Sequence, residues 1–374
     1  MRRLNILHLC SDYCKQALYS HLCSNLAASG HSQVVYCAAR SVTETIEANR
    51  LHSGLYPLFA RPILGTVDRF MFHRKVTRVA RDLLEVVDPK DFDLVHAHFL
   101  YSDGAVALRL KRSLGLPFIV SVRSTDLNVF MKYRPDLSGL LHDIIDEASK
   151  IVCLSNGYAQ RLVGSVGGGR LSRVLRDKLE IVPNGLESKW LANPLCAEPA
   201  RDRCKVICVQ DGSRNKNVPG LIAAAAEVAR FLPFTLTIVG SEPVAATRMR
   251  SRSDFEVRFV GRVSDWRVLA DLYGQHHVFA MPSFTESFGL VYIEALSQGL
   301  PIVHSKDEGP SGLFPNSLAY EVNPRSVSDI AAGIGRAFGA SRGLRADCRE
   351  AVQPIVWPNI ASRLSTLYVD AARR

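Results

Sequence analysis

The sequence predicts an α/β protein with two Rossmann-like domains, each built on a doubly wound parallel sheet. Apolar runs of strand length alternate with helix-length segments along the chain, which favours right-handed βαβ units. The runs lack an internal polar alternation, as expected for strands covered on both faces. About eleven such runs are too many for one small sheet. A chain of 374 residues is long enough for two domains with separate cores.

The first domain is expected over residues 1–190. Its strands are predicted at Leu4–Cys10, Gln33–Cys37, Leu94–His98, Phe118–Val122, Ile151–Leu154 and Leu179–Val182. Helical segments lie between them at Gln16–Ser29, Val76–Val87, Gly104–Leu114 and Leu140–Ser149. The first residues have no uninterrupted apolar region and no small-residue cleavage site, so they are interpreted as a strand rather than a signal peptide.

The second domain is expected over residues 191–356. Its strands are predicted at Cys204–Val209, Leu236–Val239, Val257–Val260, His277–Met281 and Pro301–His304, with a helix at Val218–Leu232. The segment Leu186–Arg203 is irregular and polar and contains Pro194 and Pro199, so it is predicted to join the two domains.

The net charge and the cysteine content of the chain indicate which classes of binding partner and which cellular location to expect. The formal charge of +10 favours an anionic partner, but no zinc finger, RNA-recognition signature or aromatic-interleaved basic run indicates nucleic acid. An anionic membrane surface is the preferred interpretation, although no run is long enough to span a bilayer. The nine cysteines are scattered and lack zinc-site spacing, which predicts reduced thiols and a cytoplasmic location.

A basic segment in the first domain is the candidate membrane contact. Thr66–Val87 places cations among apolar residues at a spacing that would make one basic and one apolar face of a helix. The cations are Arg69, His73, Arg74, Lys75, Arg78 and Arg81. A solvated helix face over an ordinary core is an equally good interpretation.

The stretch Ala280–Leu296 carries the strongest functional signal. An apolar strand ends at Pro282, and a helix is predicted to start near Ser287, with Gly289 leaving its first turn open to a ligand. Free N–H groups at a helix start suit an anion such as a diphosphate. Glu286 and Glu294 flank this turn, and carboxylates there are placed to accept hydrogen bonds from hydroxyls rather than to bind phosphate. The alternative is an amphipathic helix with two surface glutamates.

The block from Pro282 to Val303 resembles the Glu-x7-Glu signature of the family 4 retaining glycosyltransferases, which have the GT-B fold. The resemblance implies two Rossmann-like domains facing a cleft, with residues 357–374 forming a helix that crosses back to the first domain. It implies a nucleoside diphosphate sugar as donor, with a UDP-sugar favoured, and neither a cofactor nor a metal. The acceptor would be a glycan, and the basic segment favours a lipid-linked one at the inner face of the cytoplasmic membrane.

The resemblance assigns roles to residues after the strands of the second domain. Glu286 would hold hydroxyls of the transferred sugar, and Glu294 would hold the ribose. The diphosphate would lie against Arg214, Lys216 and the helix start at Ser287, Phe288, Gly289 and Leu290. Arg262 and Val263 fall where relatives bring main chain to the nucleotide base.

Three residues of the first domain complete the predicted site. His98 lies in a segment that resembles the family's His-x-His-Phe, although a structural histidine is the more frequent case. Two histidines are too few ligands for a metal, so none is predicted. Arg123 and Asp126 fall where relatives contact the transferred sugar and the leaving phosphate, and a structural salt bridge between them is the alternative.

Two departures from the family pattern keep other functions open. The glycine pair that relatives carry after the first strand is replaced by Ser11 and Asp12, and Gly309–Gly312 lacks the family's glutamate. These departures favour a non-catalytic scaffold that binds glycan or membrane. A nucleotide-sugar epimerase on the same fold is a further alternative.

Overall fold

The computed structural model describes residues 2–241 and 255–373, and the chain divides into two compact units. The first unit comprises Met1–Leu154, Ala159–Gly185 and Trp357–Arg374, and the second comprises Ser155–Tyr158 and Leu186–Val356. Each unit contains its own parallel sheet, which confirms the predicted fold class. The change of unit after Gly185 falls next to the segment that the sequence predicts as the join.

Within the described residues, the sheet of the first unit has seven parallel strands in the order β3-β2-β1-β4-β5-β6-β7. The strands are β1 (Asn5–Leu9), β2 (Ser32–Ala38), β3 (Leu58–Arg61), β4 (Leu94–Ala97), β5 (Phe118–Ser121), β6 (Lys150–Cys153) and β7 (Leu179–Ile181). Strand order reverses between β1 and β4, where His8 pairs with His96. Ligands of doubly wound sheets bind at the carboxyl ends of the strands beside such a reversal.

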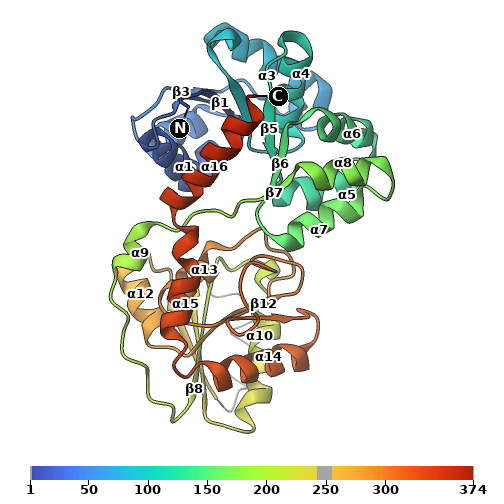
Figure 1. Ribbon diagram of the computed structural model, residues 1–374. Helices are drawn as coiled ribbons and strands as arrows, with labels where there is room; N and C mark the ends of the chain where they lie inside the picture. Colours follow the sequence, from blue (N-terminus) through green and yellow to red (C-terminus); the bar gives the residue numbers. More distant parts are fainter. Residues whose placement is uncertain (1, 242–254, 374) are drawn as a thin grey trace. The chain divides into compact units, whose positions relative to one another are not determined.

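Helices cover this sheet in two layers (Figure 1). They are α1 (Ala17–Ala28), α2 (Val42–Leu51), α3 (Phe72–Val86), α4 (Ser102–Leu114), α5 (Met131–Tyr133), α6 (Ser138–Glu147), α7 (Asn156–Ser165), α8 (Arg170–Lys178) and α16 (Trp357–Ala371). Helices α3, α4, α6 and α8 pack in a row, and α16 packs along α1. The C-terminal helix therefore belongs to the first unit, as the resemblance implies.

Within the described residues, the second unit has a six-stranded parallel sheet in the order β10-β9-β8-β11-β12-β13. The strands are β8 (Cys204–Gln210), β9 (Phe234–Gly240), β10 (Glu256–Gly261), β11 (Val278–Met281), β12 (Ile302–Ser305) and β13 (Ala319–Val322). The helices are α9 (Ser188–Ala192), α10 (Val218–Ala229), α12 (Trp266–Gly274), α13 (Leu290–Ser297), α14 (Val327–Ala340) and α15 (Arg345–Val352). The strand order of this sheet reverses between β8 and β11.

Two strands were missed by sequence analysis. Both β3 and β13 have four residues, and β3 is half-buried along its whole length. Each pairs at an edge of its sheet, so neither needs the long apolar run of a central strand.

The basic segment is helical over α3, but its cations do not share one face. Phe72, Val76, Val79 and Leu83 are buried, which confirms the amphipathic pattern. Arg74 is exposed, whereas Lys75 is half-buried and donates a hydrogen bond to Ser102 Oγ at 3.0 Å. Lys75 was grouped with the membrane-facing cations, and that assignment is wrong because its side chain turns toward α4.

Candidate active site

The reversal point of the second unit brings together the loops that follow β8 and β11. Asn215, after β8, donates through its side-chain amide to Thr285 O at 2.7 Å and accepts from Thr285 N at 3.0 Å. Phe284 N donates to Asn215 O at 2.8 Å. These bonds fix the loop that carries Lys216 against the loop that carries Glu286.

Lys216 and Glu286 form the central contact of this site. Lys216 Nζ lies 2.6 Å from Glu286 Oε2, and the side chains are 16% and 11% exposed. The other carboxylate oxygen, Glu286 Oε1, accepts from Ser287 N at 3.1 Å. The backbone of Glu286 is also held, because its N–H donates to Glu308 Oε2 at 2.7 Å. Glu286 is thus a fixed carboxylate beside a cation.

Gly289 sets the geometry of the adjoining helix start. Helix α13 begins at Leu290, three residues later than predicted, because Gly289 adopts φ 72° and ψ 82° and stands outside the helix as its N-cap. A Cβ on Gly289 would lie 2.6 Å from the Tyr292 ring and 3.2 Å from Glu286 Cγ. The first N–H groups of α13 have no partner inside the helix, so this turn remains a suitable anion site beside Glu286.

Glu294 lies one turn into α13 and is half-buried. Burial raises the pKa of the Glu294 carboxyl to about 7, and the hydrogen bond donated by Tyr273 opposes that rise. Tyr273 Oη lies 3.4 Å from Glu294 Oε2. A carboxylate that is costly to ionise without a partner is suited to accept hydrogen bonds from a ligand.

The other residues predicted for the donor differ in position. Arg214 is exposed in the loop after β8, whereas Ser287 and Leu290 are half-buried around Gly289. Phe288 as a whole residue is 1% exposed, so it packs into the core behind the turn rather than facing a ligand. Exposed Arg262 and half-buried Val263 follow the edge strand β10, and β9 lies between β10 and β8.

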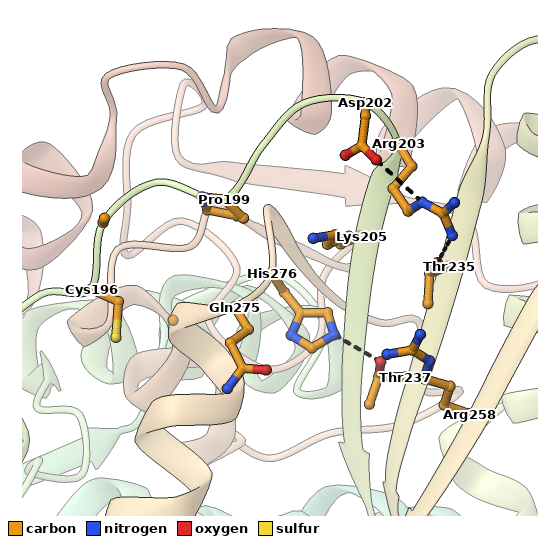
Figure 2. Close-up of a pocket in the computed structure, with 12 residues that line it drawn as sticks. Cys196, Pro199, Asp202, Arg203, Lys205, Thr235, Thr237, Arg258, Gln275 and His276 are labelled. Carbon is orange, nitrogen blue, oxygen red and sulfur yellow. Dashed lines mark hydrogen bonds and ion pairs between the residues drawn. The ribbon is translucent and has the colours of Figure 1, made fainter.

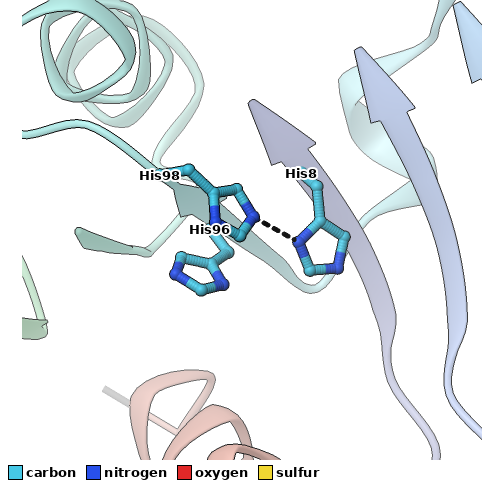
Figure 3. Close-up of side chains that lie close together, drawn as sticks. All are labelled: His8, His96 and His98. Atoms are coloured by element: carbon cyan, nitrogen blue, oxygen red, sulfur yellow. Dashed lines mark hydrogen bonds between the residues drawn. The ribbon is translucent and has the colours of Figure 1, made fainter. Parts of the chain in front are cut away.

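The reversal point of the first unit holds three buried histidines (Figure 3). His8 Nδ1 lies 3.0 Å from His98 Nε2, and the rings of His96 and His98 stack with centroids 4.0 Å apart. Burial lowers the pKa of His98 well below its usual range, so the imidazole is neutral at physiological pH. The structure places His98 in a packed network with Tyr19 edge-on to its ring.

These histidines also provide a test of a metal centre. Among the described residues, His8, His96 and His98 offer ring nitrogens within 4.8 Å of one another. Both nitrogens of His96 are engaged, with Tyr368 Oη at 2.7 Å and Ser121 Oγ at 2.9 Å. A metal held by all three would replace at least one of these bonds, so the contacts fit a hydrogen-bonded network better than a ligand set.

Arg123 is positioned by the backbone around this network. Its Nε donates to His98 O at 3.3 Å, and Nη1 donates to Asn184 Oδ1 at 3.1 Å. The side chain is 9% exposed and its guanidinium lies over the Tyr19 ring. The guanidinium is therefore fixed by neutral acceptors, which leaves its charge available to an anion.

Asp126 is placed differently from the prediction. It is fully buried, and its carboxylate accepts from the backbone N–H groups of Leu100 at 3.1 Å, Tyr101 at 3.2 Å and Arg123 at 2.8 Å. Burial raises the pKa of Asp126 to about 6. Because its oxygens accept these backbone hydrogen bonds, Asp126 positions the backbone of Arg123. It forms no side-chain salt bridge with Arg123, and its oxygens are not directed at a substrate.

A separate cavity of about 570 Å³ lies at the opposite edge of the second sheet, near the first residues of β8, β9 and β10 (Figure 2). Its guanidinium groups are partly neutralised, because Glu256 accepts from Arg258 Nε at 2.6 Å and lies 3.5 Å from Arg203 Nη1. His276 is held between Leu272 O and Thr237 Oγ1. The polar groups named here therefore already have partners within the protein, and this cavity is not assigned a ligand.

Sequence reasoning missed several residues that order the site. Asn215 and Glu308 position Glu286, Asn184 positions Arg123, and Asp103 accepts hydrogen bonds from Ser11. Two of these residues could have been found from their position in the sequence. Asn215 is adjacent to Lys216, and Glu308 directly precedes Gly309–Gly312, the turn that lacks the family's glutamate.

The described residues contain no helix with the length and apolar character needed to cross a bilayer. All nine cysteines are unpaired thiols, eight of them buried.

Two known protein families match this chain, one in each unit. The family described as Glycosyltransferase Family 4 matches residues 18–190, and the family described as Glycosyl transferases group 1 matches residues 203–339. TuaC of Bacillus subtilis (strain 168), named as a teichuronic acid biosynthesis glycosyltransferase, is 25% identical over 293 residues, covering 75% of this chain and 70% of TuaC.

Solved structures share the fold. Sucrose-phosphate synthase from Thermosynechococcus elongatus superposes with a TM-score of 0.72 at 20% identity, covering 98% of each chain. HepE of Anabaena, solved in complex with UDP-glucose, superposes with a TM-score of 0.67 at 16% identity, covering 98% of this chain and all of HepE. The two matched families span both units, and the chain belongs to the family 4 glycosyltransferases of the GT-B fold.

Proposed function

We propose that this glycosyltransferase transfers a sugar, with retention of anomeric configuration, from a nucleoside diphosphate sugar to a glycan acceptor. The observation that carries the proposal is the Lys216–Glu286 pair beside the open helix start at Gly289. A UDP-sugar is favoured as the donor because HepE, which shares the fold, was solved with UDP-glucose.

The proposed chemistry is stabilisation of the leaving diphosphate. Charge grows on the departing phosphate in the transition state, and Lys216, Arg214 and the first N–H groups of α13 face that charge. These groups supply the positive charge that a divalent ion would otherwise provide, so we propose that no metal is required. No protein nucleophile is assigned. If the acceptor hydroxyl attacks the sugar on the same face from which the diphosphate leaves, the anomeric configuration is retained without a covalent intermediate.

The carboxylates orient the donor in this proposal. Glu286, held by Lys216 and Ser287 N, accepts hydrogen bonds from hydroxyls of the transferred sugar. Glu294 accepts from the ribose, and its ionisation becomes favourable when those donors arrive. Binding at both ends holds the diphosphate against the cations between them.

The acceptor is proposed to be lipid-linked, with the first unit touching an anionic membrane surface as part of cell-surface glycan synthesis. The support is the surface around α3. It exposes the aromatic side chain of Phe70, which is 83% accessible, together with Met71 at 49%. Exposed Arg69, Arg74 and Arg81 lie in the same segment. Such a mixture binds interfaces through apolar insertion and attraction to anionic lipids.

Two measurements test the activity. Thermal unfolding with UDP-, GDP- and ADP-sugars, in EDTA, should show a rise in Tm for one nucleotide. Release of the nucleoside diphosphate should then require an acceptor and should be lost in Glu286→Ala with the fold intact. Full activity of Glu286→Ala would overturn the proposed roles. Conversion of the donor sugar without acceptor would indicate an epimerase, and absence of any nucleotide effect would indicate a scaffold.

A further inference from the structure

A polar cavity of about 210 Å³ lies in the first unit, at the carboxyl ends of the strands beside the β1/β4 reversal. The lining residues come from the segments that follow five strands, β1 to β5. The lining residues used below are Asp12, Lys15, Arg40, Lys75, Ser102 and Thr125. This is the edge at which doubly wound sheets bind ligands, and it belongs to the unit that lacks the Lys216–Glu286 pair.

The cationic groups of this cavity outnumber the anionic groups once the charges that already have a partner are set aside. Lys15 Nζ lies 2.5 Å from Asp12 Oδ1, so these two charges offset each other. Glu44, which also lines the cavity, accepts from the backbone N–H of Arg40 at 2.6 Å. Over residues 2–241 and 255–373, neither Arg40 nor Lys75 has a carboxylate within ion-pair distance.

Lys75 is the most informative group. It is half-buried on α3, and its only hydrogen bond among the described residues is the one donated to Ser102 Oγ at 3.0 Å. Burial lowers the pKa of Lys75 because the ammonium loses water, and the charges of Asp103 and Asp12, neither within ion-pair distance, only partly oppose that fall. An anionic ligand would supply the missing partner.

A buried carboxyl group lies behind Ser11, which lines the cavity. Asp103 is buried below Ser11 and accepts from Ser11 N at 3.2 Å and from Ser11 Oγ. Burial raises the pKa of Asp103 to about 7, so a substantial fraction of it is neutral near physiological pH. A neutral Asp103 does not repel an anion bound above it.

We propose that this cavity binds an anionic group of the acceptor, a phosphate or a carboxylate, through Lys75 and Arg40. The hydroxyls of Ser102 and Thr125 would donate further hydrogen bonds to the same group. The inference rests on the proposed function, because it names the substrate class that the first unit recognises. The same chemistry serves a soluble phosphorylated or acidic sugar and the phosphate of a lipid carrier.

The first test measures anion binding without turnover. The Tm of the full chain is recorded in inorganic phosphate and in chloride at equal ionic strength. The variants are Lys75→Met, Arg40→Met, Lys216→Met and the exposed control Lys90→Met. Phosphate should raise the Tm of wild type and Lys90→Met, with the rise abolished in Lys75→Met and reduced in Arg40→Met.

The Lys216→Met variant separates the two anion sites. Loss of the phosphate effect in Lys216→Met, with the effect unchanged in Lys75→Met, would place the phosphate in the second unit and overturn the proposal. Circular dichroism checks that Lys75→Met is folded, and Lys75→Arg should restore phosphate binding because it keeps the charge.

The second test compares acceptors that differ only in charge. Release of nucleoside diphosphate is measured with glucose, glucose 6-phosphate and glucuronate. At least one charged acceptor should have a KM about tenfold below that of glucose, and Lys75→Met should remove this difference while Lys90→Met preserves it. Equal KM values for all three acceptors in wild type would overturn the proposal.

A polyprenyl phosphate in neutral mixed micelles identifies the source of the anion. Displacement of inorganic phosphate by it, in a Lys75-dependent manner, assigns the cavity to a lipid carrier, whereas displacement by glucose 6-phosphate alone assigns it to a soluble acceptor. Failure of the proposed function would appear separately, as absence of diphosphate release with every acceptor. The phosphate measurement decides the cavity in that case too.

Discussion

The ammonium of Lys216 lies 2.6 Å from a carboxylate oxygen of Glu286, and both side chains are largely removed from water. The two residues come from loops 70 positions apart, after strands β8 and β11. Removal of either partner leaves the other charge buried and uncompensated, whereas removal of both does not. The contact therefore couples the stability of the second unit to the charge of its candidate donor site.

The Lys216–Glu286 coupling is testable by a double-mutant cycle. We expect Lys216→Met and Glu286→Gln each to lower the free energy of unfolding, and the double variant to lose less than their sum by about 0.5–3 kcal/mol. Urea denaturation of the four proteins measures the coupling. Simple additivity would show that the ion pair contributes nothing to the folded state.

A methyl group at Gly289 should damage both the fold and donor binding. Gly289→Ala forces a positive φ on a residue with a Cβ and brings that Cβ against the Tyr292 ring. We expect a loss of about 1–3 kcal/mol and weaker UDP-sugar binding. The matched control is Gly335→Ala in α14, where the new Cβ meets nothing within 4 Å and stability should stay level or rise. Equal behaviour of the two variants would contradict the assigned geometry.

Donor affinity should depend on pH through Glu294. Burial raises the pKa of this carboxyl to about 7, and hydrogen bonds from a ribose favour its ionised form. Affinity should therefore increase by about tenfold between roughly pH 6 and pH 8, and Glu294→Gln should flatten this profile. Calorimetric titration with the preferred nucleotide measures both. In the free protein, the same raised pKa makes this group's contribution to stability fall as pH rises from 4.5 to about 7.

The hydroxyl of Tyr368 should stabilise the attachment of the C-terminal helix. It bonds to His96 Nδ1 at 2.7 Å, and both residues are buried. Tyr368→Phe leaves a buried ring nitrogen without a partner, at a cost of about 1–3 kcal/mol. In Tyr320→Phe, the lost bond to Ser317 O is exposed, so the cost should be near zero. Chemical denaturation compares the two, and a Tyr368→Phe protein as stable as wild type would refute the network.

Membrane contact should depend on the exposed part of the basic segment. Phe70→Ser removes the most exposed aromatic side chain of the first unit's described residues, and Arg69→Glu with Arg74→Glu reverses two exposed charges. Each should reduce sedimentation with anionic vesicles, the charge reversal more strongly at low salt. Glu85→Gln, an exposed change on α3 that removes a negative charge, serves as the control and should not weaken binding. Unchanged sedimentation of all variants would remove the membrane proposal.

The sequence by itself determined the fold class, the central strands and the identity of the charged residues at the second reversal point. Buried parallel strands require apolar runs, so β1, β4, β8 and β11 were visible, and the residues after a strand necessarily lie at its carboxyl edge. The spacing of Glu286, Gly289 and Glu294 is local and needed no tertiary knowledge.

Only the tertiary structure decided which charged side chains pair with one another and which form hydrogen bonds inside the fold. Lys216 reaches Glu286 across two loops, whereas Asp126, predicted to touch substrate, is consumed by three backbone N–H groups. Lys75 was predicted to lie among the cations of the basic segment, but its side chain lines a cavity because α4 packs against α3. Pairing and burial depend on contacts between distant segments, and the free energy of a charge depends on both, so composition and spacing could not resolve them.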